Sequence, residues 1–374
     1  MARVCSSCTR LVLPVLLILA VPSTLQSLWG TSTLSMLSQL PGPPPLRVAV
    51  QNMWSDTAAV LAEMEVLLAP VAWAATGRAL VAVNVSLSQD EQLVSADVIL
   101  FGSFGDRARS GEVAIAHGHH ALTIFISSEN YAAYADSMVP DVHVAFGHRR
   151  DITACNYLRM PWWLPLVLDA STPRWALPSF SPLLRRELTG HAWFARPRAA
   201  ALLSSHYAFP RRELFRLLTS LGLDVDAPNK AFHNMEWPAG LSTHIFEAKI
   251  EFLESYRYNI CPENGRTGPG GGYSTEKAPH AFMAGAVPIY WGDAFDEDVF
   301  NPARVIFFDA EHSATVVQTI KRLEADTEFR DEWFSKPVLM PGADLWLQGW
   351  VDHAARLWKG QGQMTRGALC SQQS

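Results

Sequence analysis

Cysteine is scarce in this chain of 374 residues, which contains only five. Cys5 and Cys8 have a Cys-x-x-Cys spacing, but no second pair follows, so the sequence does not complete a zinc site of that type. Cys155, Cys261 and Cys370 are the other three, and at most one internal disulfide can form among them. The amino-terminal pair stays open to acylation.

An excess of basic residues is also missing. The chain has 30 Lys and Arg against 36 Asp and Glu, which gives a net charge of -6 and a pI of about 6.1. This balance argues against a nucleic-acid partner. With 49% hydrophobic residues and a mean hydropathy of +0.06, a chain of this length can bury large cores, and we expect two domains.

Charged residues are absent from the stretch between position 10 and Arg47. An apolar run from Leu11 to Trp29, diluted by polar residues in its second half, is long enough to cross a bilayer. It is either a cleaved signal peptide or a signal-anchor helix, and the basic residues before it predict a cytoplasmic amino terminus. We assign residues 1–30 to a cytoplasmic tail and signal anchor, and residues 31–45 to a short stem.

Short apolar segments alternate with helix-like segments in the rest of the chain, and this pattern favours parallel sheets. The candidate strands of the first half are Leu46 to Val50, Ala79 to Leu87, Ala96 to Phe101, Leu122 to Ile126 and Val142 to Phe146. Asp56 to Leu68 is the clearest helix between them. We place one domain at residues 46–185, a second at 186–355 and a tail at 356–374, connected through the polar stretch from Asp169 to Pro197. In such folds ligands bind in the crevice at the carboxyl ends of the strands.

The segment from Tyr256 to Asp309 carries the strongest functional signal. A strand-like run leads into a glycine-rich loop, a helix is expected to start at Thr275 as its N-cap, and a short strand follows from Val287 to Trp291. Glu276 and Lys277 then fall in the first helical turn, where free backbone N-H groups favour a phosphate. The alternative is an ordinary capped surface helix after a flexible loop.

A second segment repeats this arrangement upstream. Ala199 to Leu203 is expected to be a buried strand, and a helix with Leu214 and Leu218 on its apolar side follows Arg211 and Arg212. Arginine in the first turn of a helix after a strand is suited to binding an anion. The alternative is that both arginines are solvated helix-start residues.

Together these segments resemble the signature of the alpha-1,3/4-fucosyltransferase family (glycosyltransferase family 10). In that family a Phe-Glu-Asn motif, a Tyr-Val-Thr-Glu-Lys motif and a Val-Pro-Ile or Val-Pro-Val stretch before a glycine follow one another. The corresponding segments here are Pro262-Glu263-Asn264, Tyr273 to Lys277 and Val287-Pro288-Ile289. Pro262 replaces Phe and Ser274 replaces Val, which concerns the conformation of the loop more than the chemistry. The resemblance implies an α/β fold of the GT-B type, with two Rossmann-like domains facing a central cleft, and inverting transfer from GDP-fucose.

The resemblance also implies roles for individual residues. Glu129, which follows a strand-like run, matches the family's general base, although a glutamate in this place is often a solvated turn residue. Arg212 matches best the arginine on the sugar-nucleotide diphosphate, and Lys277 adds a second positive charge there. Glu276 is expected to accept hydrogen bonds from ribose hydroxyls or to orient a cation. Asn264 and Tyr273 are second choices for contacts with the nucleotide. The run Tyr157-Leu158-Arg159-Met160-Pro161 matches another family segment, to which we give a structural role.

A protein-bound metal is not expected. Asp224-Val225-Asp226 and Asp296-Glu297-Asp298 have the Asp-x-Asp form that holds a divalent metal in GT-A transferases, but neither follows a clear strand in a nucleotide-binding first domain. His117-Gly118-His119-His120 has no carboxylate or cysteine cluster beside it. The family resemblance implies no required cofactor, with GDP-fucose as the donor substrate, and is compatible with indirect stimulation by Mn²⁺.

The resemblance implies an enzyme that moves L-fucose from GDP-β-L-fucose to a GlcNAc hydroxyl of a glycoprotein or glycolipid glycan, in α-1,3 or α-1,4 linkage. The resemblance further implies a Golgi membrane protein with a single type II anchor and a lumenal catalytic domain, and the sequon Asn84-Val85-Ser86 is compatible with lumenal exposure. The sequence leaves open the acceptor, the linkage, cleavage of the amino-terminal segment and the oligomeric state. Two alternatives remain: a GT-B transferase for another nucleotide sugar, and a catalytically silent glycan-binding relative.

Overall fold

The computed structural model describes residues 43–53, 57–84, 86–103, 121–127, 142–241, 246–266, 271–293, 295–311 and 313–361. The predicted anchor and stem up to Gly42, the proposed base Glu129 and the segment His117 to His120 lie outside these residues. Among the helices that are described, none is long and apolar enough to cross a membrane. The predicted anchor lies outside the described residues, so it stays a prediction.

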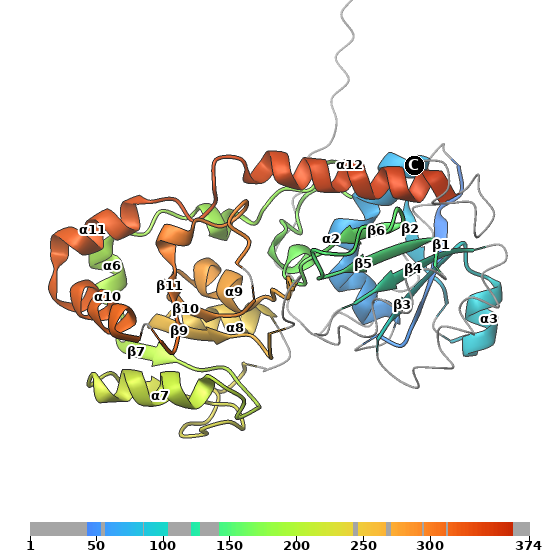
Figure 1. The fold of residues 1–374 in the computed structure, drawn as a ribbon. Coiled ribbons are helices and arrows are strands. Elements are labelled where there is room, and N and C mark those ends of the chain that lie inside the picture. Colours follow the sequence, from blue (N-terminus) through green and yellow to red (C-terminus); the bar gives the residue numbers. More distant parts are fainter. Residues whose placement is uncertain are drawn as a thin grey trace, which may run out of the picture. The chain divides into compact units, whose positions relative to one another are not determined.

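The first sheet has six parallel strands in the order β2-β1-β3-β4-β5-β6 (Figure 1). The strands are β1 (Leu46–Gln51), β2 (Leu80–Ala82), β3 (Val98–Gly102), β4 (Leu122–Ile126), β5 (Val144–Gly147) and β6 (Tyr157–Arg159). All residues of β3 and β5 are buried. This agrees with a parallel sheet that is covered on both faces, whose strands are continuous apolar runs. The five expected strands are present, but the strand expected from Ala79 to Leu87 is only three residues long.

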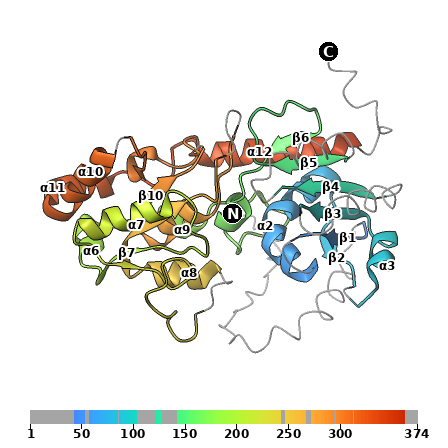
Figure 2. The same ribbon diagram turned by 60° about the horizontal axis from the view of Figure 1, so that its bottom comes forward.

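Helices from the amino-terminal and the carboxy-terminal parts of the chain cover this sheet. They are α2 (Thr57–Thr76), which starts at the place expected for the helix at Asp56, α3 (Gln89–Val94) and α12 (Ala343–Gln361). Ser88 and Glu91 form a capping box that starts α3. The carboxy-terminal helix α12 packs against α2 and also touches β5, and both views show it beside this sheet (Figures 1 and 2). The predicted boundary at residue 355 falls inside α12, and the other predicted domain boundaries stay predictions.

The second sheet has five parallel strands in the order β11-β10-β9-β7-β8. The strands are β7 (Arg198–Ala201), β8 (Val225–Asp226), β9 (Tyr256–Pro262), β10 (Val287–Trp291) and β11 (Ile306–Phe307). Its helices are α6 (Gly190–Phe194), α7 (Arg211–Ser220), α8 (Phe246–Leu253), α9 (Lys277–Ala284), α10 (Ser313–Ala325) and α11 (Thr327–Ser335). Short 3₁₀ turns occupy Leu164–Val167, Pro182–Arg185 and Pro302–Arg304.

The strand order reverses between β7 and β9, since the chain runs from β7 out to β8 and returns to β9 on the other side of β7. At such a switch point the loops after the two strands diverge and leave a crevice at their carboxyl ends. Apolar residues of β7, β9 and β10 form a core under this edge with α7, α10 and α11. The expected α/β fold with parallel sheets is confirmed, and it places the loops after β7 and β9 next to each other.

Cys155 is disulfide-bonded, whereas Cys261 on β9 is a free, buried thiol. This is compatible with the single disulfide that the cysteine count allows. Burial raises the pKa of the Cys261 thiol well above its usual value, so the thiol stays protonated. It donates hydrogen bonds to backbone carbonyls and behaves as a packing residue.

Candidate functional site

Glu263, the first residue after β9, is the centre of the candidate site. Its side chain is fully buried and its carboxylate accepts hydrogen bonds from the backbone N-H of Thr275 at 2.8 Å and from the Thr275 hydroxyl at 2.7 Å. The Lys277 ammonium lies 3.3 Å from the same carboxylate. The Tyr290 hydroxyl of β10 lies 3.5 Å from its other oxygen. Glu263 therefore joins the end of β9, the start of α9 and the end of β10.

Thr275 does not cap the helix, and this prediction was wrong. The helix α9 begins at Lys277, and Glu276 stands at the N-cap position without a side-chain cap hydrogen bond. The Thr275 hydroxyl instead donates to Glu263 and accepts a hydrogen bond from the Lys277 ammonium at 2.8 Å. The hydrogen bond to a buried carboxylate is charge-assisted and holds the hydroxyl away from the helix N-H groups, and the helix starts one residue later than predicted.

Lys277 stays charged despite its burial. Burial alone would lower its pKa, but the carboxylates of Glu276 and Glu263 outweigh that effect and raise it. Burial would likewise raise the pKa of Glu276, but Lys277, His280 and Lys249 lower it to about 2. For Glu263 burial dominates and raises the pKa, against Lys277 and Thr275. The ammonium is thus held in one place by acceptors before any ligand arrives.

Arg211, not Arg212, faces this cluster. The Arg211 side chain is 2% exposed, and its guanidinium donates to the Asn264 side-chain oxygen at 3.0 Å. Its other guanidinium nitrogens have no hydrogen-bond partner among the residues that the structure describes. Burial lowers the pKa of Arg211, and Glu263 and Tyr273 oppose this shift. Arg212 is exposed at the start of α7.

The choice between the two arginines follows from helical spacing. Leu214 and Leu218 of α7 are buried, and Arg211 lies three and seven residues before them, on the same face of the helix. Arg212 is displaced by one position and points toward solvent. The sequence contained this signal, because the apolar face of the helix was recognised but was not extended back to position 211.

The structure therefore brings together four of the six residues expected in the site, Asn264, Tyr273, Glu276 and Lys277. Tyr273 is buried and its ring meets the His148 ring edge-on, with centroids 5.3 Å apart. Arg212 does not join them, and Glu129 lies outside the described residues, although β4 ends at Ile126 three residues before it.

Two residues of the site had no role in the sequence analysis. Glu263 is the central residue of the motif Pro262-Glu263-Asn264, and the signal that points to it is a carboxylate directly after a buried strand. His148 follows β5 and is 1% exposed, and neither ring nitrogen has a hydrogen-bond partner in the described parts of the chain. Burial, together with Arg159 and Arg149, lowers the pKa of His148 to about 4 against the opposing charge of Asp293. Its imidazole is therefore neutral at physiological pH.

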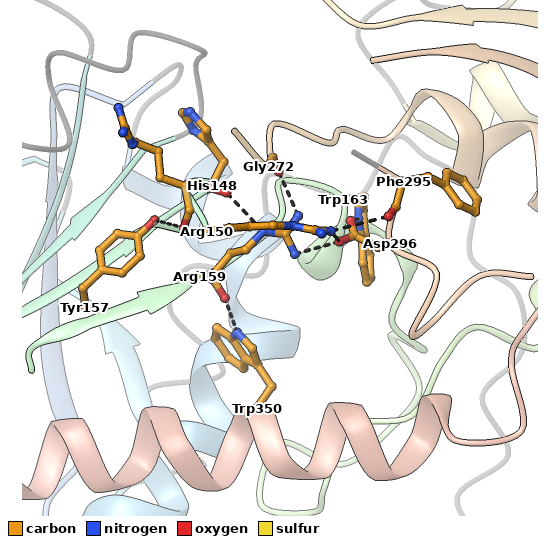
Figure 3. A network of polar contacts seen from close by, with 10 residues as sticks. His148, Arg150, Tyr157, Arg159, Trp163, Gly272, Phe295, Asp296 and Trp350 are labelled. Carbon is orange, nitrogen blue, oxygen red and sulfur yellow. Dashed lines mark hydrogen bonds and ion pairs between the residues drawn. The ribbon is translucent and has the colours of Figure 1, made fainter. Parts of the chain in front are cut away.

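Both Asp-x-Asp sequences are engaged by cations of the protein. Asp296 accepts from Arg159 at 2.7 Å, from Arg150 at 3.2 Å and from the Trp163 indole at 2.7 Å (Figure 3). Asp226 pairs with Arg198 and accepts from the Tyr256 hydroxyl. Within the described residues, no group of three or more His, Cys, Asp or Glu side chains is arranged to hold a metal ion.

The chain is similar in sequence to two fucosyltransferases. No family model matches the chain. A provisionally named fucosyltransferase of Acanthamoeba polyphaga mimivirus is 26% identical over 160 residues, which are 41% of this chain and 26% of that protein. The alpha-(1,3)-fucosyltransferase FucT of Helicobacter pylori is 44% identical over 54 residues, 14% of this chain and 11% of that protein. The matches thus span about a quarter and a tenth of these relatives.

Solved structures extend the likeness over the whole fold. A crystal structure of an alpha1,3-fucosyltransferase superposes with a TM-score of 0.57 and 20% identity, and covers 84% of this chain and 91% of that one. Crystal structures of an alpha1,3-fucosyltransferase with GDP and with GDP-fucose have TM-scores of 0.53 and 0.54 over the same share of this chain. At this identity the superposition establishes the fold, and together with the sequence matches it confirms the resemblance expected from the motifs.

Proposed function

We propose that this chain, a relative of the alpha-1,3-fucosyltransferases in sequence and fold, is an inverting fucosyltransferase that uses GDP-β-L-fucose. We further propose that the acceptor is a GlcNAc hydroxyl and that the linkage formed is α-1,3 or α-1,4. One observation carries the proposal: Glu263 and Thr275 hold the Lys277 ammonium at the start of α9, and Arg211 lies nearby at the switch point of the second sheet. Two fixed cations and the N-terminus of a helix suit a diphosphate.

The proposed reaction is a single in-line displacement. Glu129 takes the proton of the acceptor hydroxyl while its oxygen attacks the anomeric carbon of fucose, and the bond to the GDP oxygen breaks on the opposite face. Negative charge develops on the leaving diphosphate. Arg211 and Lys277 stabilise that charge, and because both are already held by Asn264, Glu263 and Thr275, little reorganisation is needed.

Glu276 and Asn264 complete the donor side. The pKa of Glu276 is about 2, so its carboxylate is ionised and would repel a phosphate. It accepts hydrogen bonds well, which fits the ribose hydroxyls of the nucleotide. Asn264 is exposed beside Arg211, and its amide is available to the nucleotide or to the sugar.

The acceptor is proposed to lie at the carboxyl edge of the first sheet. Gln51 ends β1, Ser103 follows β3 and His148 follows β5, and each is a buried polar residue with a side-chain atom that has no hydrogen-bond partner in the described residues. None of the three carries a charge at neutral pH. Uncharged groups with unused hydrogen-bonding capacity suit the hydroxyls of a neutral glycan.

The cellular setting is proposed from the sequence alone. The apolar run from Leu11 to Trp29 is taken as a signal anchor of type II, which would place the two sheets in the Golgi lumen with the glycoprotein and glycolipid acceptors. Immunofluorescence with protease protection of a carboxy-terminal tag tests this. Digestion of the tag in intact Golgi vesicles would contradict the proposed topology.

Transfer from labelled GDP-fucose tests the activity. The full-length chain, purified in mild detergent, is offered lactosamine-type and N-glycan-core acceptors with and without EDTA, and GDP-mannose serves as a control for the sugar. We expect transfer of fucose alone, unchanged by EDTA, and its loss in Lys277→Gln but not in Lys321→Gln, an exposed lysine of α10. Neither transfer nor GDP binding by the wild-type chain would overturn the proposal, and GDP binding without transfer to any acceptor would favour the silent relative.

A further inference from the structure

The loop that precedes Lys277 is attached to the first half of the molecule. Residues 271–275 follow the glycine-rich loop after β9 and have no helical or strand structure of their own. The Gly272 carbonyl accepts a hydrogen bond from the Arg159 guanidinium at 2.8 Å, and the Ser274 carbonyl accepts one from the backbone N-H of Trp162 at 3.0 Å. The carbonyls on either side of Tyr273 are thus held by residues at and just after the end of β6.

Arg159 is the centre of this attachment (Figure 3). Its guanidinium also donates to the His148 carbonyl at 3.1 Å and pairs with Asp296 at 2.7 Å. Its own carbonyl accepts from the Trp350 indole of α12 at 2.8 Å. One side chain of the first sheet therefore connects the end of β5, the loop before α9 and the loop after β10, while its backbone is fixed by α12.

The ion pair between Arg159 and Asp296 lies in the interior of the protein. Asp296 is 4% exposed and Trp163, which donates to it, is fully buried. Arg150 also reaches Asp296, but its side chain is 46% exposed, so Arg159 is the better shielded of the two cations. A buried carboxylate needs its cation, since an uncompensated charge in the interior is strongly unfavourable.

The absence of a side chain at Gly272 allows this loop to approach Arg159 and His148. A Cβ atom added there would overlap the His148 carbonyl and would come within 2.9 Å of the Arg159 Nε atom. Only glycine therefore lets the loop lie close enough to reach Arg159. The ring of Tyr273 beside it packs on His148, so the same approach sets the position of the tyrosine.

From these contacts we infer that Arg159 is a positioning residue for the donor site: it fixes the loop from Gly272 to Thr275, and through this loop the Lys277 ammonium, without touching the nucleotide. The inference rests on the proposed function for the identity of the ligand. It gives roles to two sequence features without an assigned function, the segment around Arg159 and the acidic sequence at Asp296. It also makes donor affinity depend on a residue of the half that is proposed to bind the acceptor.

Arg159→Lys is the most informative variant. Lysine keeps the positive charge beside Asp296, but its ammonium group cannot donate at once to the three acceptors of the planar guanidinium, which are Asp296 and the carbonyls of His148 and Gly272. We expect its Kd for GDP and its KM for GDP-fucose to rise about tenfold, because a loop that Arg159 no longer holds has to be ordered when the ligand binds. The KM for the acceptor is expected to rise less than the KM for the donor, because Arg159 contacts the backbone carbonyl of His148 and not its imidazole ring. Gly272→Ala is expected to reproduce this pattern through the other side of the contact.

Arg185→Lys is the matched control. Arg185 also pairs with an aspartate, Asp344 at 2.6 Å, but both side chains are about half exposed and neither contacts the donor loop. We expect no change in Kd or KM for this variant.

Hydrogen exchange of the peptide covering residues 271–284 separates this inference from the proposed function. Exchange in that peptide should quicken in Arg159→Lys and not in Arg185→Lys, whether or not GDP binds. A failure of the wild-type chain to bind GDP would remove the proposed function and leave the exchange result to decide the anchoring. A lowered melting temperature of Arg159→Lys with unchanged exchange, Kd and KM would overturn the inference, since Arg159 would then contribute only to stability.

Discussion

The residues proposed to meet the donor and those proposed to meet the acceptor differ in charge and in how their polar groups are used. The edge of the second sheet carries Arg211, Glu263, Glu276 and Lys277, whose charges are close together and largely paired within the protein. At the edge of the first sheet, Gln51, Ser103 and His148 are uncharged and leave polar atoms unpartnered in the described residues. The comparison suggests one edge built in advance for a charged donor and another that completes its hydrogen bonds with a neutral acceptor.

The largest expected effect comes from removing Glu263. In Glu263→Ala the partly buried Lys277 ammonium and the buried Thr275 hydroxyl lose their shared acceptor, so we expect a loss of about 3 kcal/mol in the free energy of unfolding, together with the loss of GDP binding. Urea denaturation and calorimetric titration measure the two. Stability close to that of the wild type would mean that the charged edge does not depend on this carboxylate.

The two buried histidines give a dependence on pH at both edges. Burial lowers the pKa of His148 and of His280 to about 4 from an ordinary value of 6.5. The unfolded chain therefore binds more protons, so the contribution of each neutral histidine is fully present above about pH 6.5 and is lost as the pH falls toward 4, by up to about 3 kcal/mol each. Unfolding free energies measured between pH 4 and 7 should show this slope.

Replacing each histidine by Gln should remove part of that slope. His148→Gln is expected to leave GDP binding intact, because the first edge does not hold the diphosphate. An unchanged slope in both variants would mean that other groups control the acid sensitivity.

The two neighbouring arginines of α7 provide the next test. Arg211→Gln should weaken GDP binding by about 10- to 100-fold, in line with the loss of one or two charged hydrogen bonds. Arg212→Gln should change it by less than about twofold because its side chain is exposed. Titration of GDP into both variants measures the difference, and a larger effect at Arg212 would reverse the assignment made from the structure.

The smallest effect is expected at the uncharged residues of the proposed acceptor side, Gln51 and Ser103. Gln51→Ala and Ser103→Ala each remove one neutral hydrogen-bonding group, which is worth about 1 kcal/mol, or about fivefold in the KM of the acceptor. The Kd of GDP should not change. A change in GDP affinity that exceeds the change in acceptor KM would erase the distinction between the two edges.

The sequence predicted the larger features because they depend on patterns along the chain. Alternating apolar segments gave the parallel sheets, and the motif around Tyr273 to Lys277 gave the donor side of the site. The start of α9 was missed by one residue because the acceptor of the Thr275 hydroxyl, Glu263, lies twelve residues away. Local capping preference could not include that partner.

Contacts between distant segments were beyond sequence reasoning. Nothing in the spacing of Arg159 and Asp296, 137 positions apart in the sequence, indicates that they meet, and Asp296 was weighed only as a metal ligand. The choice of Arg212 over Arg211 was different. The buried positions Leu214 and Leu218 would have selected Arg211 had the helix face been followed to its first residue.

Affinity for GDP compared with GMP tests the central claim most directly, because the two ligands differ by the phosphate that the charged edge is proposed to hold. Calorimetric titration of both into the full-length wild type and Lys277→Gln gives four dissociation constants. We predict that the wild type binds GDP at least about tenfold more tightly than GMP, and that most of this preference is lost in Lys277→Gln. Equal affinity for GDP and GMP in the wild type, or a preference that survives in Lys277→Gln, would contradict a diphosphate site built around this lysine.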